Sequence, residues 1–269
     1  MPRIAIRDIE IYFERKGPAS AAPPLLFISG TGSDLRRKPS MLDAAWPKHF
    51  DTLAYDQRGL GQTDKPDYAY SMADYADDAA ALMEAIGWGS ANVIGISFGG
   101  MVAQELTLRH PGKVRRLVLG CTSPGGAGGA SYPLHTLQEM PPEARVRHML
   151  PIQDVRCDAA WQEAHPQEVE TLIRMALDDP WADEPGRVMG ARRQLEARRH
   201  HDVWERLPQI EAPTLIAAGR YDGMALPETQ ERLARQIPGA ELIFFEGGHL
   251  FMMQDPKAIP AMIDFLLSA

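Results

Sequence analysis

Three side chains that could together make an alcohol nucleophilic lie far apart in the sequence: Ser97, Asp222 and His249. A serine hydroxyl is a weak nucleophile unless a neighbouring base removes its proton. Histidine is the side chain best suited to that task near neutral pH. A carboxylate on the other ring nitrogen fixes the tautomer and stabilises the imidazolium that forms. These residue types therefore indicate nucleophilic catalysis, provided that the fold brings them together.

The immediate surroundings of Ser97 predict a sharp turn between a strand and a helix. An apolar run at residues 93–96 predicts a buried strand, and apolar residues at helical spacing follow the serine. Gly95 and Gly99 are needed because side chains there would clash where the strand and the helix approach each other. Such a turn lifts the Ser97 hydroxyl out of the sheet and directs the Phe98 backbone N–H towards the same point.

Asp222 and His249 follow two further predicted strands, each at its carboxyl end. The apolar run 213–219 precedes Asp222, and the run 241–245 leads through two glycines to His249. Taken singly, Asp222 could be a turn former and His249 a loop histidine. Because ligands of parallel sheets bind beyond the carboxyl ends of the strands, the two residues can instead meet Ser97 there. The chain order Ser, Asp, His favours a single catalytic site.

A glycine-rich turn follows another apolar run, residues 25–28, which predicts a central strand covered on both faces. The turn, residues 29–32, could present backbone N–H groups to a ligand, and an ordinary strand-to-helix turn is the alternative. Further strands are predicted at residues 50–55 and 114–121, with a helix at residues 72–86 between them. This alternation predicts an α/β fold with a parallel sheet and right-handed crossovers.

The chain changes character after Ser123. A stretch rich in Pro and Gly at residues 124–130 is followed by helical patterns without a convincing strand. We interpret residues 124–208 as a helical cap, inserted after the sixth strand into a core made of residues 1–123 and 209–269. The Met and Trp side chains of the cap are expected to form mainly its own core, with a minority lining a pocket.

The remaining polar clusters are interpreted as structural. The basic residues 36–38 are expected in a solvated loop, with contact to a substrate carboxylate as the alternative. Asp56 and Arg58 are expected to anchor a loop. His165 and the histidines at 200 and 201 lack the spacing of metal ligands, so no metal site is predicted and these histidines are assigned to the surface or to structure.

Composition restricts the partners of the protein. A formal net charge of −8 argues against nucleic acid or an anionic membrane surface. No apolar stretch approaches the length of a membrane span, the N-terminus lacks a long apolar signal region, and sparse cysteine suits a reducing compartment. We therefore expect a cytoplasmic protein that acts on a small molecule. The serine chemistry described above needs no cofactor, and the oligomeric state, monomer or homodimer, is left open by the sequence.

Nearly the whole chain resembles the α/β-hydrolase family. Within that family it looks most like small bacterial carboxylesterases and 3-oxoadipate enol-lactonase-like hydrolases. The resemblance implies an α/β-hydrolase fold with a mostly parallel sheet flanked by helices. The segments that carry the resemblance are residues 29–32, 56–61, 95–100, 219–222 and 248–249.

The resemblance also implies a role for each site residue. Ser97 is expected to be the nucleophile, His249 the base and Asp222 the acid that orients it. The backbone N–H groups of Thr31 and Phe98 are expected to form the oxyanion hole, the pair of donors that stabilises the transition state.

One segment departs from the family pattern, which usually has His-Gly where this chain has Ser29-Gly30. The backbone plan is retained, but the support behind the oxyanion hole differs. The expected reaction is cleavage of a carboxylic ester or lactone through an acyl-serine intermediate. Two alternatives remain: a C–C bond hydrolase of vinylogous diketones such as aromatic ring-cleavage products, and a non-enzymatic ligand receptor with a vestigial triad.

Overall fold

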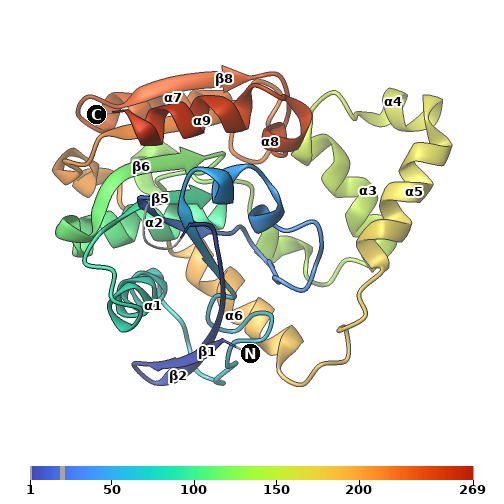
Figure 1. The fold of residues 1–269 in the computed structure, drawn as a ribbon. Coiled ribbons are helices and arrows are strands. Elements are labelled where there is room, and N and C mark those ends of the chain that lie inside the picture. Colours follow the sequence, from blue (N-terminus) through green and yellow to red (C-terminus); the bar gives the residue numbers. More distant parts are fainter. Residues whose placement is uncertain (1, 19–21, 269) are drawn as a thin grey trace.

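The computed structural model describes residues 2–18 and 22–268 (Figure 1). Within these residues, eight strands form one sheet in the order β1-β2-β4-β3-β5-β6-β7-β8. The first two strands and β4 pair antiparallel, and every later pair of neighbours is parallel, which confirms the mostly parallel sheet. The strands are β1 (Arg3–Ile6), β2 (Ile9–Lys16), β3 (Pro24–Ile28), β4 (Asp51–Tyr55), β5 (Ala91–Ile96), β6 (Val114–Gly120), β7 (Thr214–Gly219) and β8 (Glu241–Phe245).

Helices cover both faces of the sheet and also fill the segment between β6 and β7. They are α1 (Met72–Ala85), α2 (Phe98–Arg109), α3 (Pro142–Gln153), α4 (Ala159–Ala164), α5 (Pro166–Leu177), α6 (Arg187–Arg199), α7 (Pro227–Gln236), α8 (Phe251–Gln254) and α9 (Ala258–Leu267). The side chain of Ser71 caps α1 by accepting the Asp74 N–H, and Asp74 returns a bond to the Ser71 N–H, so two donors of the first turn are satisfied.

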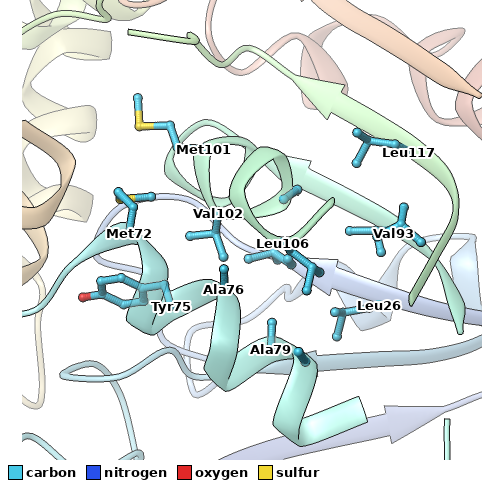
Figure 2. Close-up of a cluster of buried hydrophobic side chains, with 14 of the residues drawn as sticks. Leu26, Met72, Tyr75, Ala76, Ala79, Val93, Met101, Val102, Leu106 and Leu117 are labelled. Carbon is cyan, nitrogen blue, oxygen red and sulfur yellow. The ribbon is translucent and has the colours of Figure 1, made fainter. Parts of the chain in front are cut away.

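The alternation of side chains along the central strands divides the core into two layers. Leu26 of β3 faces the layer formed with α1 and α2, whereas Leu25 and Phe27 face the layer that contains α9. Figure 2 shows the first layer, where side chains of α1 and α2 pack on Leu26, Val93 and Leu117 of three neighbouring strands. Both faces of these strands are thus withdrawn from water, as the continuous apolar run at residues 25–28 predicts.

In the sequence, helices α3 to α6 come between β6 and β7. In Figure 1, α3, α4 and α5 stand beside the sheet. Their own buried cluster is small and consists of Leu150, Val169 and Ile173 with Trp161 packed against it. The expectation that Met and Trp side chains form the core of this segment is therefore wrong for most of them. Met175 has 65% of its surface exposed. The bounds of a cap domain at residues 124 and 208 remain a prediction.

Helices α7, α8 and α9 lie in the C-terminal third of the chain. Helix α7 begins at Pro227, a residue favoured at the first position of a helix, where its missing N–H is not needed. The short helix α8 was not expected from the sequence. Leu267, at the end of α9, is exposed, with 48% of its surface accessible. Among the described residues, the structure contains no helix with the length and apolar character to cross a membrane.

Candidate active site

Ser97 stands between the last residue of β5 and the first residue of α2. Its backbone has φ 55° and ψ −115°, a conformation that costs a residue with a side chain about 1–3 kcal/mol. Two hydrogen bonds hold it there: the Ser97 N–H donates to the Gly120 carbonyl at 2.8 Å, and the Thr122 hydroxyl donates to the Ser97 carbonyl at 2.7 Å. The turn expected at this point is therefore present, and hydrogen bonds to the end of β6 and to the residue Thr122 just after it stabilise the turn.

The glycines on either side of Ser97 are required by close packing. A Cβ atom on Gly95 would overlap the Gly99 carbonyl, and a Cβ on Gly99 would overlap the Ile28 carbonyl at the end of β3. Helix α2 consequently begins directly against the sheet. The Phe98 N–H occupies the first position of α2, where a backbone N–H has no acceptor inside the helix.

The structure brings Ser97, His249 and Asp222 together, although 152 positions separate the first two and 27 the second pair. His249 Nε2 lies 3.0 Å from Ser97 Oγ, and His249 Nδ1 lies 2.8 Å from Asp222 Oδ2. Both distances are in the hydrogen-bonding range. The imidazole thus bridges the hydroxyl and the carboxylate through its two nitrogens, the geometry that base-assisted nucleophilic attack requires.

The Asp222 carboxylate is almost completely buried, with 1% of its surface exposed. Its second oxygen, Oδ1, accepts the backbone N–H groups of Met224 at 2.8 Å and Ala225 at 3.0 Å. These bonds compensate for the water that the carboxylate loses on burial and fix its plane. One oxygen therefore anchors the side chain while the other faces the imidazole.

Close backbone contacts position the loop that carries His249. The His249 N–H donates to the Gln153 carbonyl at the end of α3, at 2.6 Å. A Cβ on Gly248 would overlap that same carbonyl, and a Cβ on Gly219 would overlap the Gly248 carbonyl. Helix α3 thus contacts the loop directly, so the cap segment contributes to the placement of the imidazole.

A group that the sequence did not connect with the site lies beside it. The thiol of Cys121 is buried, and its sulfur lies within 4.8 Å of a carboxylate oxygen of Asp222 and of a ring nitrogen of His249. Burial by itself lowers the pKa of the His249 imidazole, but the Cys121 sulfur and the Asp222 carboxylate outweigh it, so that the pKa is raised above its ordinary value. The position of Cys121 directly after β6 is the signal that could have placed it at the same edge of the sheet.

The turn after β3 lies next to Ser97. A Cβ built on Gly30 would lie 3.5 Å from the Ser97 Cβ. Two glutamine side chains hold the turn: Gln57 Nε2 donates to the Ser29 carbonyl at 2.8 Å, and the Gly32 N–H donates to Gln194 Oε1 at 2.9 Å. Gln57 belongs to the segment 56–61 that carries the family resemblance, but the sequence assigned no role to it. Gln194 was not identified because it belongs to α6, more than 160 positions from the turn.

An open pocket joins this turn to the cap segment. It has a volume of about 680 Å³ and extends from Thr31 and Gly32 to helices α3 and α5. Apart from Gln138, Arg145 and Gln153, its lining from the cap is apolar, and it includes Met149 and Met175. The minority of cap methionines expected to line a pocket is thus found.

A sequence profile described as the alpha/beta hydrolase fold matches residues 23–256. The chain belongs to this family. Its most similar relatives include the "Putative carbamate hydrolase RutD" of Variovorax paradoxus strain S110, with 30% identity over 95% of this chain and 96% of the relative. A 2-hydroxymuconate semialdehyde hydrolase from Pseudomonas putida shares 28% identity over 94% of this chain and 84% of the relative.

The crystal structure of the enol-lactonase from Burkholderia xenovorans LB400 has the same fold, with a TM-score of 0.81. It shares 24% identity, and the superposition covers 99% of this chain and 100% of the other. The family match and the relative with 30% identity make this chain a hydrolase, and the lactonase structure shows the same fold. Where many members of the family have His-Gly after β3, the chain has Ser29-Gly30, and Gln57 holds the Ser29 carbonyl from behind.

The clusters interpreted as structural are tied into ion pairs and stacks. Arg58 is buried and pairs with Asp78 at 2.7 Å and with Asp8 at 2.8 Å, so it anchors its loop as expected. Arg36 is held by Asp34 and Glu184, each at 2.7 Å, and is not the solvated residue that the sequence suggested.

The histidines outside the triad behave differently from one another. His165 stacks on Trp161 with ring centroids 4.6 Å apart, and His200 is exposed. His201 is not a surface residue, because only 7% of it is accessible.

Proposed function

We propose that this α/β hydrolase cleaves carboxylic esters or lactones through an acyl-serine intermediate. The observation that supports the proposal is the continuous hydrogen-bonded series from Asp222 through His249 to Ser97, at 2.8 and 3.0 Å. In this proposal Ser97 is the nucleophile, His249 the general base and Asp222 the residue that holds the imidazole in the required tautomer.

The reaction proceeds in two halves. Ser97 Oγ attacks the acyl carbon while its proton passes to His249 Nε2, which gives a tetrahedral oxyanion. The backbone N–H groups of Thr31 and Phe98 face this oxyanion, and donors of that kind each stabilise a transition state by about 3 kcal/mol. His249 then protonates the leaving alkoxide. Water, activated by the same imidazole, hydrolyses the acyl-serine and regenerates the enzyme.

The pocket next to Thr31 favours an apolar acyl group. Its cap lining is rich in Leu, Val and Met side chains from α3 and α5. Burying one additional methylene there gains about 0.8 kcal/mol, roughly a fourfold gain in kcat/KM per carbon. We therefore expect p-nitrophenyl butyrate and hexanoate to be better substrates than the acetate, until the chain exceeds the pocket.

A second candidate reaction is hydrolysis of a C–C bond in a vinylogous diketone. The relative from Pseudomonas putida, named a 2-hydroxymuconate semialdehyde hydrolase, supports it. Here His249 would deliver a proton to carbon in place of an alkoxide. Side-by-side assays with a ring-cleavage product, p-nitrophenyl esters, a lactone and a carbamate separate the candidates: the highest kcat/KM identifies the bond that is cleaved.

Replacement of Ser97 by alanine tests the proposal directly. The S97A variant should lose at least about 10⁴-fold of p-nitrophenyl butyrate turnover while its circular dichroism and melting temperature match those of the wild type. A fluorophosphonate probe should label the wild type and not S97A. The matched control is S90A, at the amino end of β5, which should keep full turnover.

Two outcomes would contradict the proposal. Turnover retained in a folded S97A protein would exclude Ser97 as the nucleophile. Failure of the fluorophosphonate to label the wild type would favour a ligand receptor with an inactive triad.

A further inference from the structure

Arg198, in the last turn of α6, is a buried cation without a negatively charged partner. Only 6% of its surface is exposed, and it forms no ion pair with any residue in the described ranges 2–18 and 22–268. Arg58, which is also buried, pairs with Asp78 and Asp8. A buried charge is unfavourable unless an opposite charge compensates it, so the environment of Arg198 is incomplete as the chain alone builds it.

The Arg198 guanidinium has N–H donors that the protein leaves unused. Its Nη1 donates to the Tyr132 carbonyl at 2.9 Å and its Nη2 to Ser131 Oγ at 2.6 Å. A guanidinium carries five N–H groups, and the Nε–H is buried without an acceptor among the described residues. The Nε–H and an Nη–H side by side form the fork that binds a carboxylate through both of its oxygens.

A small cavity lies at this arginine, apart from the pocket next to Thr31. Its volume is about 70 Å³, and its lining includes Arg198, His201, Ser123 and Ser131. That volume holds a molecule of a few heavy atoms. Ser123 Oγ accepts the Ser131 N–H at 3.1 Å, and its own hydroxyl hydrogen remains available because no described residue accepts it.

His201 adds a second, incompletely satisfied polar group to the same cavity. It is 7% exposed, and its ring contacts the Ser123 backbone, although neither ring nitrogen forms a hydrogen bond of regular geometry to a described residue. Burial lowers the pKa of His201 to about 4, so at neutral pH the ring is uncharged and one of its nitrogens carries a hydrogen to donate.

The charges around the cavity favour an anion. Arg199 and His135 also line it, and burial together with Arg199 and Arg198 lowers the pKa of His135. The nearest acidic side chain in the sequence, Asp202, is exposed, and its Oδ1 accepts the Trp204 N–H at 3.1 Å. Asp202 is near enough to His201 to raise its pKa, but none of the described residues that line the cavity carries a carboxylate.

The cavity lies where the chain crosses between the sheet and the cap segment. The chain leaves the sheet after β6 and returns to it after α6. These two crossings pair through a β-bridge between Gly125 and Asp202. The Val203 N–H donates to the Pro124 carbonyl at 2.9 Å beside it. A ligand in the cavity would contact Ser123 and Ser131 on one crossing and Arg198 on the other.

We propose that this cavity binds a small monocarboxylate, of the size of formate or acetate, between the Arg198 guanidinium and the Ser123, Ser131 and His201 side chains. The bound carboxylate neutralises Arg198 and connects α6 to the segment that follows β6. The site is separate from Ser97, and its occupancy does not depend on the reaction proposed above.

Thermal unfolding in sodium formate tests the proposal, with sodium chloride keeping the ionic strength constant. The melting temperature of the wild type should rise along a saturable curve, by about 3–6 °C when formate reaches ten times its Kd. R198Q, which removes the charge and the fork, should lose this rise. The matched control R192Q, an exposed arginine on the same helix, should keep it.

The design separates this site from the triad. Formate bound next to Ser97 would stabilise R198Q as much as the wild type, and that result would overturn the proposal. A wild type that responds equally to formate and to chloride would overturn it as well. Should R198Q not fold, R198K retains the charge without the planar fork and should bind formate at least tenfold more weakly; unchanged affinity in R198K contradicts the proposal.

Discussion

Asp222 illustrates how one side chain serves two purposes at the residue scale. Its Oδ1 accepts the Met224 and Ala225 N–H groups and so orders its own loop, while its Oδ2 faces His249. An asparagine can keep the first function, because its amide oxygen still accepts the two N–H groups. It cannot keep the second, because an amide NH₂ would face the imidazole nitrogen and favour the wrong tautomer.

We therefore expect D222N to fold normally and to lose about 10⁴-fold in kcat for p-nitrophenyl butyrate, with little change in KM. Steady-state kinetics and thermal unfolding of the same preparation check this expectation. A loss of less than tenfold would mean that the carboxylate contributes little beyond positioning the loop.

Cys121 allows a second prediction at this scale, on pH. A general base must be neutral, and the pKa of His249 is raised in the folded protein. We therefore expect kcat/KM to increase with pH, and the apparent pKa of this rising limb of the profile should exceed the ordinary histidine value of about 6.5. The Cys121 sulfur contributes to the rise, so C121A should move the limb to lower pH.

The matched control is C157A, the other free cysteine, which lies in the cap segment and should leave the limb in place. The comparison is made by measuring kcat/KM between pH 5 and 10. The ester used should be hydrolysed by the same mechanism over this whole range. An unmoved limb in C121A would show that the sulfur does not act on the imidazole.

The sequence predicted Ser97, Asp222 and His249 because each follows a strand, and the ends of parallel strands necessarily share one edge. It did not predict Cys121, which follows β6 in the same way but whose residue type suggested an incidental thiol. The role of Gln194 could not be predicted from the sequence for another reason. Its bond to the Gly32 N–H depends on how α6 folds back over the turn, and nothing in the local pattern encodes that path.

At the scale of elements, the approach of α2 to the sheet decides where Ser97 stands. G99A should lower the free energy of unfolding by about 3 kcal/mol or more and abolish turnover, because its Cβ would overlap the Ile28 and Ser29 carbonyls. The control is G112A after α2, where an added Cβ meets nothing within 4 Å. Its stability should stay within about 1 kcal/mol of the wild type.

Urea unfolding followed by tryptophan fluorescence measures both variants. If G99A and G112A were equally stable, the helix would have room to withdraw from the strand, and the strict requirement for glycine would be wrong.

Elements with a strong periodic signal were predicted well, and short ones were not. The strands β3 to β8 and helix α1 lie where the apolar runs and the helical period indicate. Helix α8 has only four residues, too few to produce a helical period. Cap methionines were assigned to a core because hydrophobicity alone does not distinguish a packed side chain from one that lines an open pocket.

At the scale of the whole molecule, an ion-pair network joins the turn after β3 to the cap segment. Asp34 is buried and accepts hydrogen bonds from Arg36 at 2.7 Å and from Arg187 at 3.1 Å, and Arg36 also reaches Glu184. Arg36 and Glu184 are 148 positions apart, which is why residues 36–38 appeared in the sequence as a solvated basic loop.

This network predicts a loss of stability in acid. Burial by itself raises the pKa of Asp34, but the bonds from Arg36 and Arg187 outweigh it and lower the pKa below its ordinary value. A carboxyl whose pKa is depressed in the folded state stabilises the protein above its unfolded pKa of about 4, and that contribution disappears as the pH falls through the folded value. The free energy of unfolding of the wild type should therefore decline below about pH 4.

D34N should be less stable than the wild type at pH 7, and its decline in acid should be shallower because the titrating group is absent. Urea unfolding at pH 3, 4, 5 and 7 provides the comparison. D183N, an exposed carboxyl of the cap segment that forms no ion pair with the described residues, is the control and should follow the wild-type curve. Parallel curves for D34N and the wild type would exclude the network as the source of the acid sensitivity.

The β-bridge between Gly125 and Asp202 has an evolutionary consequence. Since the chain leaves and re-enters the sheet at neighbouring points, the segment between them can be exchanged or lengthened without moving strands β5 and β8, provided that the replacement keeps the contacts of Gln153 and Gln194 with the His249 loop and the turn after β3. New substrate preferences could thus arise by replacing one contiguous stretch of gene. Recombination experiments that swap this insert between homologues have natural junctions at these two residues.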